Sequence, residues 1–491
     1  MSLFKAPPLA DLLDAAGLDW TSATVAAVAI VLTSLLIGFL RSLRSPVALV
    51  YGAETVQIAV VDEDQVRRVP FAQFLKTTCP ALFGPAASYY PTVWLASGHA
   101  QTIFASVRNY LVKNGPVFGN GLSYEREIVT LPDGGSISLD WCPGNKGLPF
   151  DDTPIVVLMH GISGGSHESY VKDTIAEIAA GPHRYRTVVV NFRGCANTKI
   201  TTSQLYSAGY TDDYKLALEH IQRCCPGAPM IGVGFSLGAN IMLKALGEMG
   251  TACPLVSAVS VSNPYDMLVS SRAVHRQWFG SNVYSKVMAM KLKSVFKEHI
   301  THFENHDEID ADHVLQSRNT TEFDDRMTRR SFRYRSVDEY YRLSSSVLQL
   351  PNVRIPMLCL HSLDDPISDR EAIPFGEVRC NPYVVLATTP RGGHLGWWAG
   401  QLKPKRWFPV PVSQYITAMF ENYTRLPKDL QESFHEPVGL TKPLIPSRII
   451  LPFSTPLDDH VVRSESRLGF GFGGSPEPSD ESLTDETSVT S

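Results

Sequence analysis

A serine between two glycines, in the pattern G-x-S-x-G, is the first feature of this sequence that could carry chemistry. Ser236 is flanked by Gly234 and Gly238. The apolar run 230–233 predicts a buried strand before it, and 237–249 predicts a helix after it. A strand that turns sharply into a helix leaves no room for side chains two residues from the apex, and it exposes the apex hydroxyl at a helix N-terminus. This pattern predicts that Ser236 is a catalytic nucleophile.

A serine nucleophile needs a base within hydrogen-bonding distance and an acid that orients this base. Two later apolar runs, 357–361 and 383–387, predict strands, and each is followed by a loop with a suitable residue. His394 lies in the glycine-containing loop after the second strand and is the expected base. The loop after the first strand contains two neighbouring carboxylates, Asp364 and Asp365. We expect Asp365, which directly precedes a proline, to orient the histidine, with Asp364 as the alternative.

The oxyanion of a tetrahedral intermediate needs two backbone N–H donors. The residue after the nucleophile, Leu237, is the expected first donor. The run HGISGG, from His160 to Gly165, follows the predicted buried strand 155–159, and the N–H of Ile162 is the expected second donor. Because this run lacks the G-x-G-x-x-G spacing and a P-loop lysine, it does not predict nucleotide binding. We expect no cofactor and no metal ion.

Other histidines are interpreted without a catalytic role. His99 lies in a run that follows neither a helix nor a strand period, and we interpret it as structural. His302 and Asp307 match the H-x-x-x-x-D pattern of some acyltransferases, but they lie in a charged segment where a solvated face is expected. The histidines at 299, 302 and 306 lack a matching carboxylate framework, so a metal site is not predicted there.

The elements that must position these residues alternate between strand and helix from about residue 121. A hairpin is predicted around Pro132–Gly135, and the expected elements after it are strands at 155–159, 187–191, 230–233 and 256–262 and helices at 170–180, 212–225 and 237–249. The alternation predicts an α/β fold with a mostly parallel sheet and helices on both faces. Residues 267 to about 345 contain no strand-like run and predict a helical lid insertion. A last helix is expected at 412–423.

An uncharged apolar run precedes this domain. Residues 20–40 contain no charged side chain and are long enough to cross a bilayer as a helix. Trp20 at one end and Arg41 and Arg44 at the other resemble interface anchors. We therefore predict a single-pass transmembrane anchor after a short segment, 1–19, with a signal peptide or a buried helix as alternatives. Localisation to a membrane, such as the endoplasmic reticulum or a lipid-droplet-associated membrane, follows as an expectation, with the orientation open.

The remaining parts of the chain complete the predicted organisation. Residues 46–120 are expected to form an approach segment that packs on the hydrolase domain, 121–430. A C-terminal extension, 431–491, becomes acidic and rich in serine and threonine, so it is expected to be disordered from about 464. The net charge of −5 gives no reason to expect a nucleic-acid partner. The eight cysteines contain no C-x-x-C, so neither a disulfide framework nor a zinc site is indicated.

Several further runs occur in order with these motifs. They are Trp94-Leu95, GHAQT at 98–102, NFRGC at 191–195, Asn263-Pro264, Asp364 to Pro366, and Gly393-His394. Together with HGISGG and G-x-S-x-G they resemble the α/β-hydrolase superfamily over roughly 70–425. More narrowly, they resemble the branch of the bacterial YheT-type hydrolases, the animal ABHD-type membrane hydrolases and the fungal medium-chain acyl ethyl ester synthase/esterases. The resemblance implies a triad of Ser236, Asp365 and His394. One departure is His361-Ser362, where relatives tend to carry Asn-Ala.

These observations predict a membrane-anchored serine hydrolase that cleaves carboxylic esters of lipids through an acyl-enzyme. The resemblance adds an alternative, an alcohol O-acyltransferase that passes a medium-chain acyl group from acyl-CoA to a short-chain alcohol and makes an ethyl ester. The sequence does not separate the two, because the choice depends on whether the pocket admits alcohol or water. An inactive anchored scaffold is the third reading, and the intact serine, acid and histidine argue against it.

Overall fold

The computed structural model describes residues 44–436, apart from 64, 85–86, 115–121, 144–150 and 305, together with the isolated residues 29 and 33. The predicted N-terminal segment 1–19, the predicted anchor 20–40 and nearly all of the predicted extension 431–491 lie outside the described residues. Within the described part of the chain, no helix is both long and apolar enough to cross a bilayer. The anchor therefore stays a prediction from the sequence.

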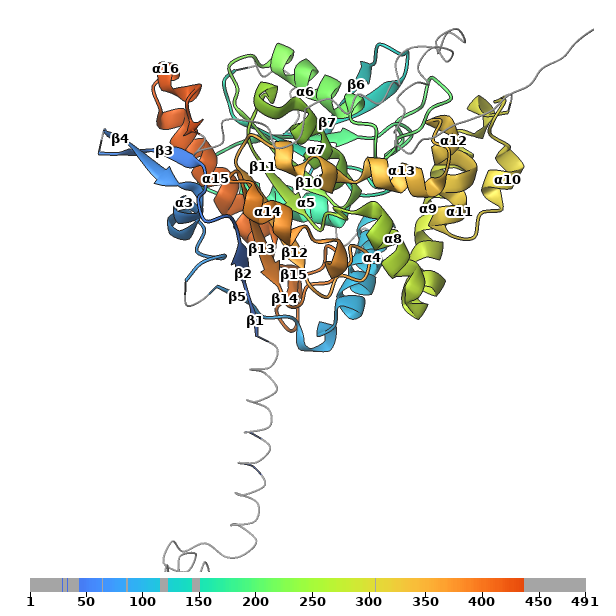
Figure 1. Ribbon diagram of the computed structural model, residues 1–491, viewed down its shortest axis with the longest axis horizontal. Coiled ribbons are helices and arrows are strands. Elements are labelled where there is room, and N and C mark those ends of the chain that lie inside the picture. Colours follow the sequence, from blue (N-terminus) through green and yellow to red (C-terminus); the bar gives the residue numbers. More distant parts are fainter. Residues whose placement is uncertain are drawn as a thin grey trace, which may run out of the picture. The chain divides into compact units, whose positions relative to one another are not determined.

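A nine-stranded sheet lies at the centre of the described domain, in the order β2-β13-β12-β11-β10-β8-β9-β7-β6 (Figure 1). The strands from β13 to β9 in this order are parallel, whereas β2, β7 and β6 pair antiparallel with their neighbours. The strands are β2 (Ala48–Val50), β6 (Glu125–Thr130), β7 (Ser136–Cys142), β8 (Ile155–Met159), β9 (Arg186–Asn191), β10 (Met230–Phe235), β11 (Leu255–Val261), β12 (Met357–Ser362) and β13 (Val384–Thr389). The predicted, mostly parallel sheet is confirmed.

Helices cover both faces of this sheet. They are α5 (Ser169–Ala179), α6 (Asp212–Cys224), α7 (Leu237–Met249), α14 (Phe375–Cys380) and α15 (Pro409–Arg425). Alternate residues of β8 belong to different cores: Ile155 and Val157 pack with α6 and α7, whereas Val156 and Leu158 pack with α5 and α15. A parallel strand that is covered on both sides has to be apolar throughout, which explains the unbroken aliphatic runs. The predicted α/β-hydrolase fold is confirmed.

The segment between β11 and β12 contains helices and no strand in its described residues, as in the predicted lid 267–345. Its elements are α8 (Met267–Arg276), the π-helix η3 (Gly280–Tyr284), α9 (Ser285–Glu298), α10 (Ala311–Leu315), α11 (Thr320–Phe323), the π-helix η5 (Asp324–Thr328), α12 (Arg329–Ser331), α13 (Val337–Ser344) and the 3-10 helices η4 (Ile300–His302), η6 (Ser346–Leu348) and η7 (Leu350–Asn352). Apolar lid side chains such as Leu292, Phe296 and Met327 are buried in the same core as α6 and α7. The lid therefore packs on one face of the sheet.

The N-terminal part of the described chain is joined to this domain at several places. β1 (Ser45–Pro46) pairs with β5 (Ser88–Tyr89), and β2 completes an edge of the main sheet. β3 (Gln57–Asp62), β4 (Gln65–Pro70) and β16 (His435–Glu436) form a separate sheet beside α3 (Phe71–Thr78). Residues 98–114 form a helix, α4 (Gly98–Asn114), although no helical period was recognised around 90–102. The reason is that the buried residues of α4 include two polar ones, Gln101 and Thr102, beside Ala105.

Candidate active site

Ser236 lies at the turn between β10 and α7, with φ 52° and ψ −120°. A side chain at either flanking glycine would collide with the backbone. A Cβ on Gly234 would lie 2.5 Å from Ala239 Cα, and a Cβ on Gly238 would lie 2.5 Å from the carbonyl oxygen of His160. The positive φ of Ser236 is a conformation that non-glycine residues rarely adopt, and the close packing on both sides maintains it. The sequence argument for the two glycines is therefore correct.

Ser236, His394 and Asp365 form one hydrogen-bonded series. The Nε2 atom of His394 lies 2.8 Å from Ser236 Oγ, and its Nδ1 atom lies 2.8 Å from Asp365 Oδ2 and 3.1 Å from Oδ1. A carboxylate can only accept, so Nδ1 carries the hydrogen and Nε2 is left to accept the serine hydroxyl proton. The arrangement can deprotonate Ser236 as it attacks an acyl carbon.

Backbone N–H groups fix the position of the Asp365 carboxylate. Its Oδ1 atom accepts hydrogen bonds from the N–H groups of Ile367 and Ser368, both at 2.9 Å. Burial alone would raise the pKa of Asp365, but the charge and hydrogen bond of His394 hold it below its ordinary value. The carboxylate is therefore ionised over the whole physiological pH range.

Asp364, the alternative acid, has a different role. Its Oδ1 atom accepts a hydrogen bond from the Ser362 hydroxyl at 2.6 Å and one from the Gly393 N–H at 2.9 Å. Burial raises the pKa of Asp364, although these two hydrogen bonds oppose the shift. Of the two neighbouring carboxylates, the structure places Asp365 on the histidine ring and Asp364 on the backbone of the histidine loop.

In the loop after β8, a backbone N–H group without a hydrogen-bond acceptor in the described part of the chain lies between two N–H groups that have one. The N–H of Gly161 donates to the hydroxyl of Tyr170 at 2.8 Å, and the N–H of Ser163 donates to the hydroxyl of Tyr206 at 2.9 Å. The hydrogen bonds among the described residues give the N–H of Ile162, which lies between them, no acceptor. Ile162 is therefore a residue of this loop whose N–H has no acceptor among the described residues, and its role as an oxyanion donor stays a prediction.

The same loop passes close to the nucleophile. A Cβ on Gly161 would lie 3.3 Å from Ser236 Cβ, so the loop and the turn are in contact. Leu237 follows Ser236 as the first residue of α7, and its N–H likewise has no acceptor among the described residues. Both expected oxyanion donors therefore belong to backbone segments that meet beside the Ser236 hydroxyl.

His160 stabilises this loop through hydrogen bonds of both ring nitrogens. Burial lowers the pKa of His160 to about 3, so the ring is neutral. Its Nδ1 atom lies 2.7 Å from the carbonyl oxygen of Gly161, and its Nε2 atom accepts the N–H of Phe192 at 3.2 Å. A neutral ring can donate at one nitrogen and accept at the other, which is the pattern seen here.

Sequence reasoning missed the contribution of α4 to the site. The hydroxyl of Thr102 accepts the N–H of His394 at 2.9 Å. Gly98 touches the acid loop, because a Cβ there would lie 1.9 Å from the carbonyl oxygen of Asp364. The run GHAQT was noticed only as part of the resemblance, and nothing in its period indicated these contacts. His99, interpreted as structural, lies with Nδ1 2.8 Å from the hydroxyl of Tyr284 in the lid.

The departure at His361 and Ser362 is accommodated by hydrogen bonds within the acid loop. His361 is buried, and its Nε2 atom lies 2.9 Å from the carbonyl oxygen of Ser368. Burial lowers the pKa of His361, so its ring is neutral and Nε2–H is the donor. The residue whose N–H binds Asp365 is thus itself held by His361.

A narrow cavity of about 50 Å³ extends from the site into the lid. Ile162 and Leu237, the two expected oxyanion residues, line one end. The other lining residues are Leu205, Tyr206, Met267, Leu292, Val295, Phe323, Asp324, Met327, Thr328 and Tyr340. Asp324 is the acidic residue of this otherwise mostly apolar lining. Burial raises the pKa of Asp324 to about 6, although Thr328 and Tyr341 donate hydrogen bonds to its carboxylate.

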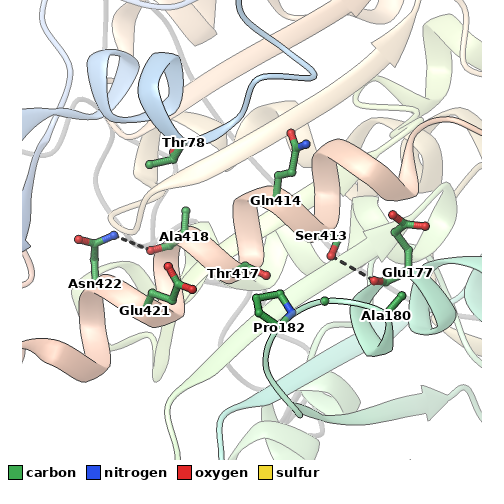
Figure 2. Close-up of a pocket in the computed structure, with 11 residues that line it drawn as sticks. Thr78, Glu177, Ala180, Pro182, Ser413, Gln414, Thr417, Ala418, Glu421 and Asn422 are labelled. Carbon is green, nitrogen blue, oxygen red and sulfur yellow. Dashed lines mark hydrogen bonds between the residues drawn. The ribbon is translucent and has the colours of Figure 1, made fainter.

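A more open cavity, of about 390 Å³, lies away from Ser236 (Figure 2). It is formed by α15, the C-terminal end of α5 and Thr78 at the end of α3. Its side chains are largely polar, including Glu177, Gln414 and Glu421. None of the residues of the Ser236 site lines it, so its size does not make it the reacting centre.

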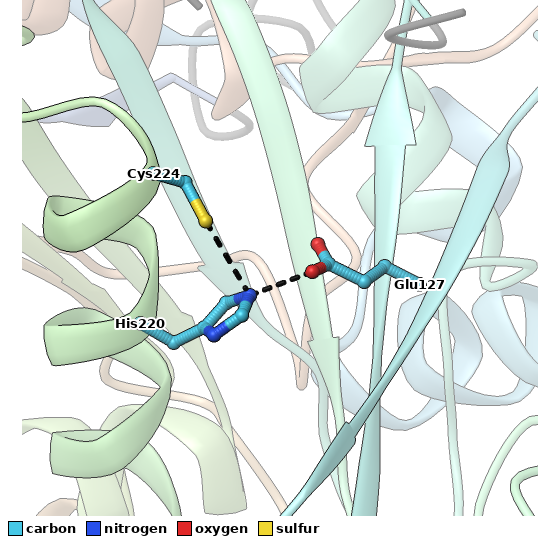
Figure 3. A group of neighbouring side chains, drawn as sticks. All are labelled: Glu127, His220 and Cys224. Carbon is cyan, nitrogen blue, oxygen red and sulfur yellow. Dashed lines mark hydrogen bonds and ion pairs between the residues drawn. The ribbon is translucent and has the colours of Figure 1, made fainter.

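One group of side chains has the composition of a metal site (Figure 3). His220 Nε2 lies 2.6 Å from Glu127 Oε1 and 3.6 Å from Cys224 Sγ. The spacing of four residues on a helix between His220 and Cys224 was the signal that sequence reasoning missed. Glu127 lies on β6, four strands from β10, or roughly 19 Å at the usual strand spacing. This group therefore cannot take part in chemistry at Ser236.

The charged-segment histidines do not form such a group. Within the described residues, side chains with metal-ligating atoms gather at Glu127, His220 and Cys224, whereas the histidines at 299, 302 and 306 belong to no such group. His299 is buried, with Nε2 3.3 Å from the carbonyl oxygen of Gly194. The eight cysteines are free thiols.

Comparisons with known proteins agree with this geometry. Residues 152–377 match the family model described as serine aminopeptidase, S33. Embryogenesis-associated protein EMB8 of Picea glauca is 36% identical over 344 residues, which are 68% of this chain and 73% of EMB8. Phospholipase ABHD3 of Mus musculus is 33% identical over 359 residues, 72% of this chain and 83% of that protein. Medium-chain fatty acid ethyl ester synthase/esterase 2 of Saccharomyces cerevisiae is 28% identical over 424 residues, 73% and 92% of the two chains. This protein belongs to the α/β-hydrolase family, in its ABHD3-like branch.

Proposed function

We propose that this protein is a membrane-anchored serine hydrolase that cleaves carboxylic esters of lipids, with medium-length acyl groups, through an acyl-enzyme. The observation that carries the proposal is the hydrogen-bonded series Ser236–His394–Asp365, with both links at 2.8 Å. A serine in a contact-enforced positive φ, with a histidine nitrogen on its hydroxyl and a carboxylate on the other ring nitrogen, has few explanations other than nucleophilic catalysis. Similarity to a phospholipase and to an esterase supports a lipid ester as substrate.

The proposed reaction follows from the placement of the groups. Ser236 Oγ attacks the acyl carbon while its proton passes to His394 Nε2, and the negative charge that develops on the carbonyl oxygen is stabilised by the N–H groups of Ile162 and Leu237. His394 then donates the proton to the departing alcohol, which leaves the acyl group on Ser236. Water gives a proton to His394 and attacks the acyl carbon, and His394 returns this proton to Ser236 Oγ as the bond to the acyl group breaks and the acid leaves. Asp365 holds the imidazole and stabilises its positive charge throughout.

The cavity next to the oxyanion donors supports an acyl substrate. Ile162 and Leu237 supply both the N–H groups and part of the apolar wall, so the first carbons of an alkyl chain attached to a carbonyl at Ser236 would enter this cavity. Because its volume is about 50 Å³, a medium-length chain also requires lid side chains such as Met267 and Leu292 to move. Apolar contact along such a chain contributes roughly 0.8 kcal/mol for each buried methylene. We infer that the enzyme distinguishes its substrates mainly by the acyl part.

An alcohol acyltransferase is the second candidate. It uses the same acyl-enzyme and differs only in the group that resolves it, a short-chain alcohol in place of water. The observation that favours it is the similarity to the yeast ethyl ester synthase/esterase, a protein whose name contains both activities. An acyl-CoA thioester would then be the donor and a fatty acyl ethyl ester the product.

One experiment tests both proposals and the scaffold reading. Full-length protein in detergent is treated with a fluorophosphonate probe and then assayed with p-nitrophenyl esters of graded chain length, with and without ethanol. Ser236→Ala should lose labelling and turnover, whereas Ser203→Ala, at an exposed serine in a loop, should retain both. Equal labelling of the wild type and Ser236→Ala would refute the nucleophile, and an unlabelled wild type would favour the scaffold. Ethyl ester formed in preference to free acid would favour the transferase.

A further inference from the structure

We propose that an exposed apolar surface on α4 and the start of the lid rests on the lipid bilayer and holds the active site against it. This inference rests on the proposed membrane-anchored hydrolase and adds the face of the domain that meets the lipid. The α4 surface, as we call it, consists of Trp94, Ile103, Val107, Leu111, Trp278 and Phe279, all exposed. Apolar side chains of this size, gathered on one face, mark an interaction site on a protein surface.

The exposed apolar residues of α4 share one side of the helix. Ile103, Val107 and Leu111 follow one another at intervals of four residues, which places them on the same face, and Tyr110 on this face is 68% exposed. A helix in a globular domain ordinarily buries such a stripe. Here the stripe faces outward, whereas Gln101, Thr102 and Ala105 on the other side of α4 are buried.

The lid continues this surface past the start of α4. The ring of Phe279 lies 5.3 Å from that of His99 on α4, and the ring of Trp278 lies 5.1 Å from Phe279. Trp278 is 69% exposed. Trp94, which precedes α4 in the sequence, contacts this helix through Phe104, and the centres of the two rings lie 5.2 Å apart. Trp278 and Phe279 lie between α8 and η3, so the surface spans α4 and a lid segment that is far from it in sequence.

The place where the predicted anchor joins the domain selects a bilayer as the occupant. The uncharged run ends at residue 40, and Ser45 is already paired with Tyr89 in β1 and β5. The five Cα–Cα steps from residue 40 to Ser45 span at most about 18 Å. If residues 20–40 cross a bilayer, Tyr89 and its exposed neighbour Tyr90 must lie close to the lipid surface. Trp94 follows only four residues later, and tryptophan and tyrosine favour the interface between lipid and water.

Docking through α4 has a direct consequence for the reaction. Thr102, in the first turns of α4, binds the N–H of His394, and Gly98 touches the acid loop. The helix that rests on the lipid is therefore the one that supports the base and the acid. A lipid ester that leaves the bilayer beside α4 enters next to the reacting groups, which raises turnover of membrane-borne substrate without changing the chemistry of a soluble ester.

The first test compares two substrates with the full-length protein reconstituted in phosphatidylcholine vesicles. The double variant Val107→Asp, Leu111→Asp should lower turnover of p-nitrophenyl laurate dissolved in the vesicles by about tenfold, the equivalent of ~1.4 kcal/mol, while turnover of water-soluble p-nitrophenyl butyrate changes by less than about twofold. Ile128→Asp, at an exposed apolar residue on β6 outside the α4 surface, is the matched control and should change neither. An unchanged ratio between the two substrates in the double variant would overturn the proposal.

The second test measures contact with lipid and does not depend on catalysis. Phosphatidylcholine brominated in its acyl chains quenches tryptophans that lie in the bilayer. The fluorescence of the wild type should be quenched more than that of Trp278→Phe, because the other tryptophans are common to both. Equal quenching would overturn the docking, as expected if this face binds a protein instead. A wild type that hydrolyses neither ester but shows the Trp278 signal would contradict the proposed function and leave the docking in place.

Discussion

The hydroxyl of Thr102 accepts the backbone N–H of His394 at 2.9 Å, across 292 residues of sequence. Thr102 belongs to α4, which precedes the first strand of the parallel sheet, whereas His394 belongs to the loop after the last one. A Cβ on Gly393, the residue before the histidine, would lie 2.4 Å from the carbonyl oxygen of Gly98. The position of the base is therefore set by an element outside the alternating strands and helices.

Thr102→Val should slow the reaction without removing a reacting group. The substitution keeps the shape of the side chain but removes the acceptor of the His394 N–H, so the base loses one positional restraint. We expect kcat for a soluble ester to fall about fivefold to tenfold, because one hydrogen bond contributes about 1 kcal/mol. KM should change little. Thr102→Ser keeps the hydroxyl and should retain most of the activity, and equal losses in the two variants would contradict the positioning role.

Substitution of Asp365 should lower kcat far more than substitution of its neighbour Asp364. Asp365→Asn removes the charge that orients and stabilises His394, and kcat should fall by about 10⁴. Asp364→Asn keeps an oxygen that can accept from the N–H of Gly393, and kcat should fall by about tenfold at most. Steady-state kinetics on the same soluble ester distinguish the two. A larger loss in Asp364→Asn would show that the acid has been assigned to the wrong carboxylate.

Gly98→Ala and Gly376→Ala should change stability in opposite directions. A Cβ on Gly98 would lie 1.9 Å from the carbonyl oxygen of Asp364, so the acid loop has to move, at a cost of about 1–3 kcal/mol. A Cβ on Gly376 in α14 would meet no atom within 4 Å, and alanine should stabilise that helix by about 0.5–1 kcal/mol. Urea unfolding measures both. A neutral Gly98→Ala would contradict the tight contact between α4 and the acid loop.

Tyr170→Phe should weaken transition-state stabilisation through the oxyanion loop. The Tyr170 hydroxyl accepts the N–H of Gly161, and without it this amide is left buried and unpaired next to Ile162. We expect kcat/KM to fall roughly tenfold, from a loss of about 1–2 kcal/mol. Tyr185→Phe, at a tyrosine packed on α15, is the control and should be close to wild type. Full activity in Tyr170→Phe would show that the loop is positioned by other contacts.

Asp324 should make the folded protein less stable at neutral than at acidic pH. Its pKa is about 6 in the folded state, above the ordinary value of 3.8, so the folded state holds a proton that the unfolded state has lost between these values. The stability from this group is present below pH 3.8 and is lost as pH rises through 6. From pH about 4.5 to about 7.5, Asp324→Asn should therefore gain about 2 kcal/mol relative to the wild type in urea unfolding. Asp312→Asn, at an exposed carboxylate in the lid, should show no such gain.

The parallel strands and the nucleophile turn could be predicted because their constraints are local. A run such as 155–159 has to be apolar at every position when both faces are covered, and the sequence of the run records this directly. The glycines at 234 and 238 can be predicted because any side chain at these positions would collide with the backbone beside Ser236. The sequence alone does not decide whether Asp364 or Asp365 binds the histidine, because this depends on where the N–H groups of Ile367 and Ser368 point.

Elements that are polar inside or very short could not be predicted. α4 buries Gln101 and Thr102 because they bind the backbone N–H groups of Trp398 and His394, so its inner face carries only a weak apolar period. β2, at 48–50, is too short to show an alternation, and its pairing with β13 is a long-range contact. The contact between Glu127 and His220 could not be predicted either, because β6 and α6 are brought together by the order of the strands in the sheet.

The antiparallel strand β2 also limits where a truncated form of this protein can begin. A fragment that begins at residue 121, at the start of the strand and helix alternation, would lack β2 and leave β13 with a row of unpaired backbone groups, an edge that invites aggregation. The same fragment would lack Thr102 and Gly98, so its histidine loop would be unsupported. An expressible catalytic fragment without residues 1–43 has to retain everything from β1 onward.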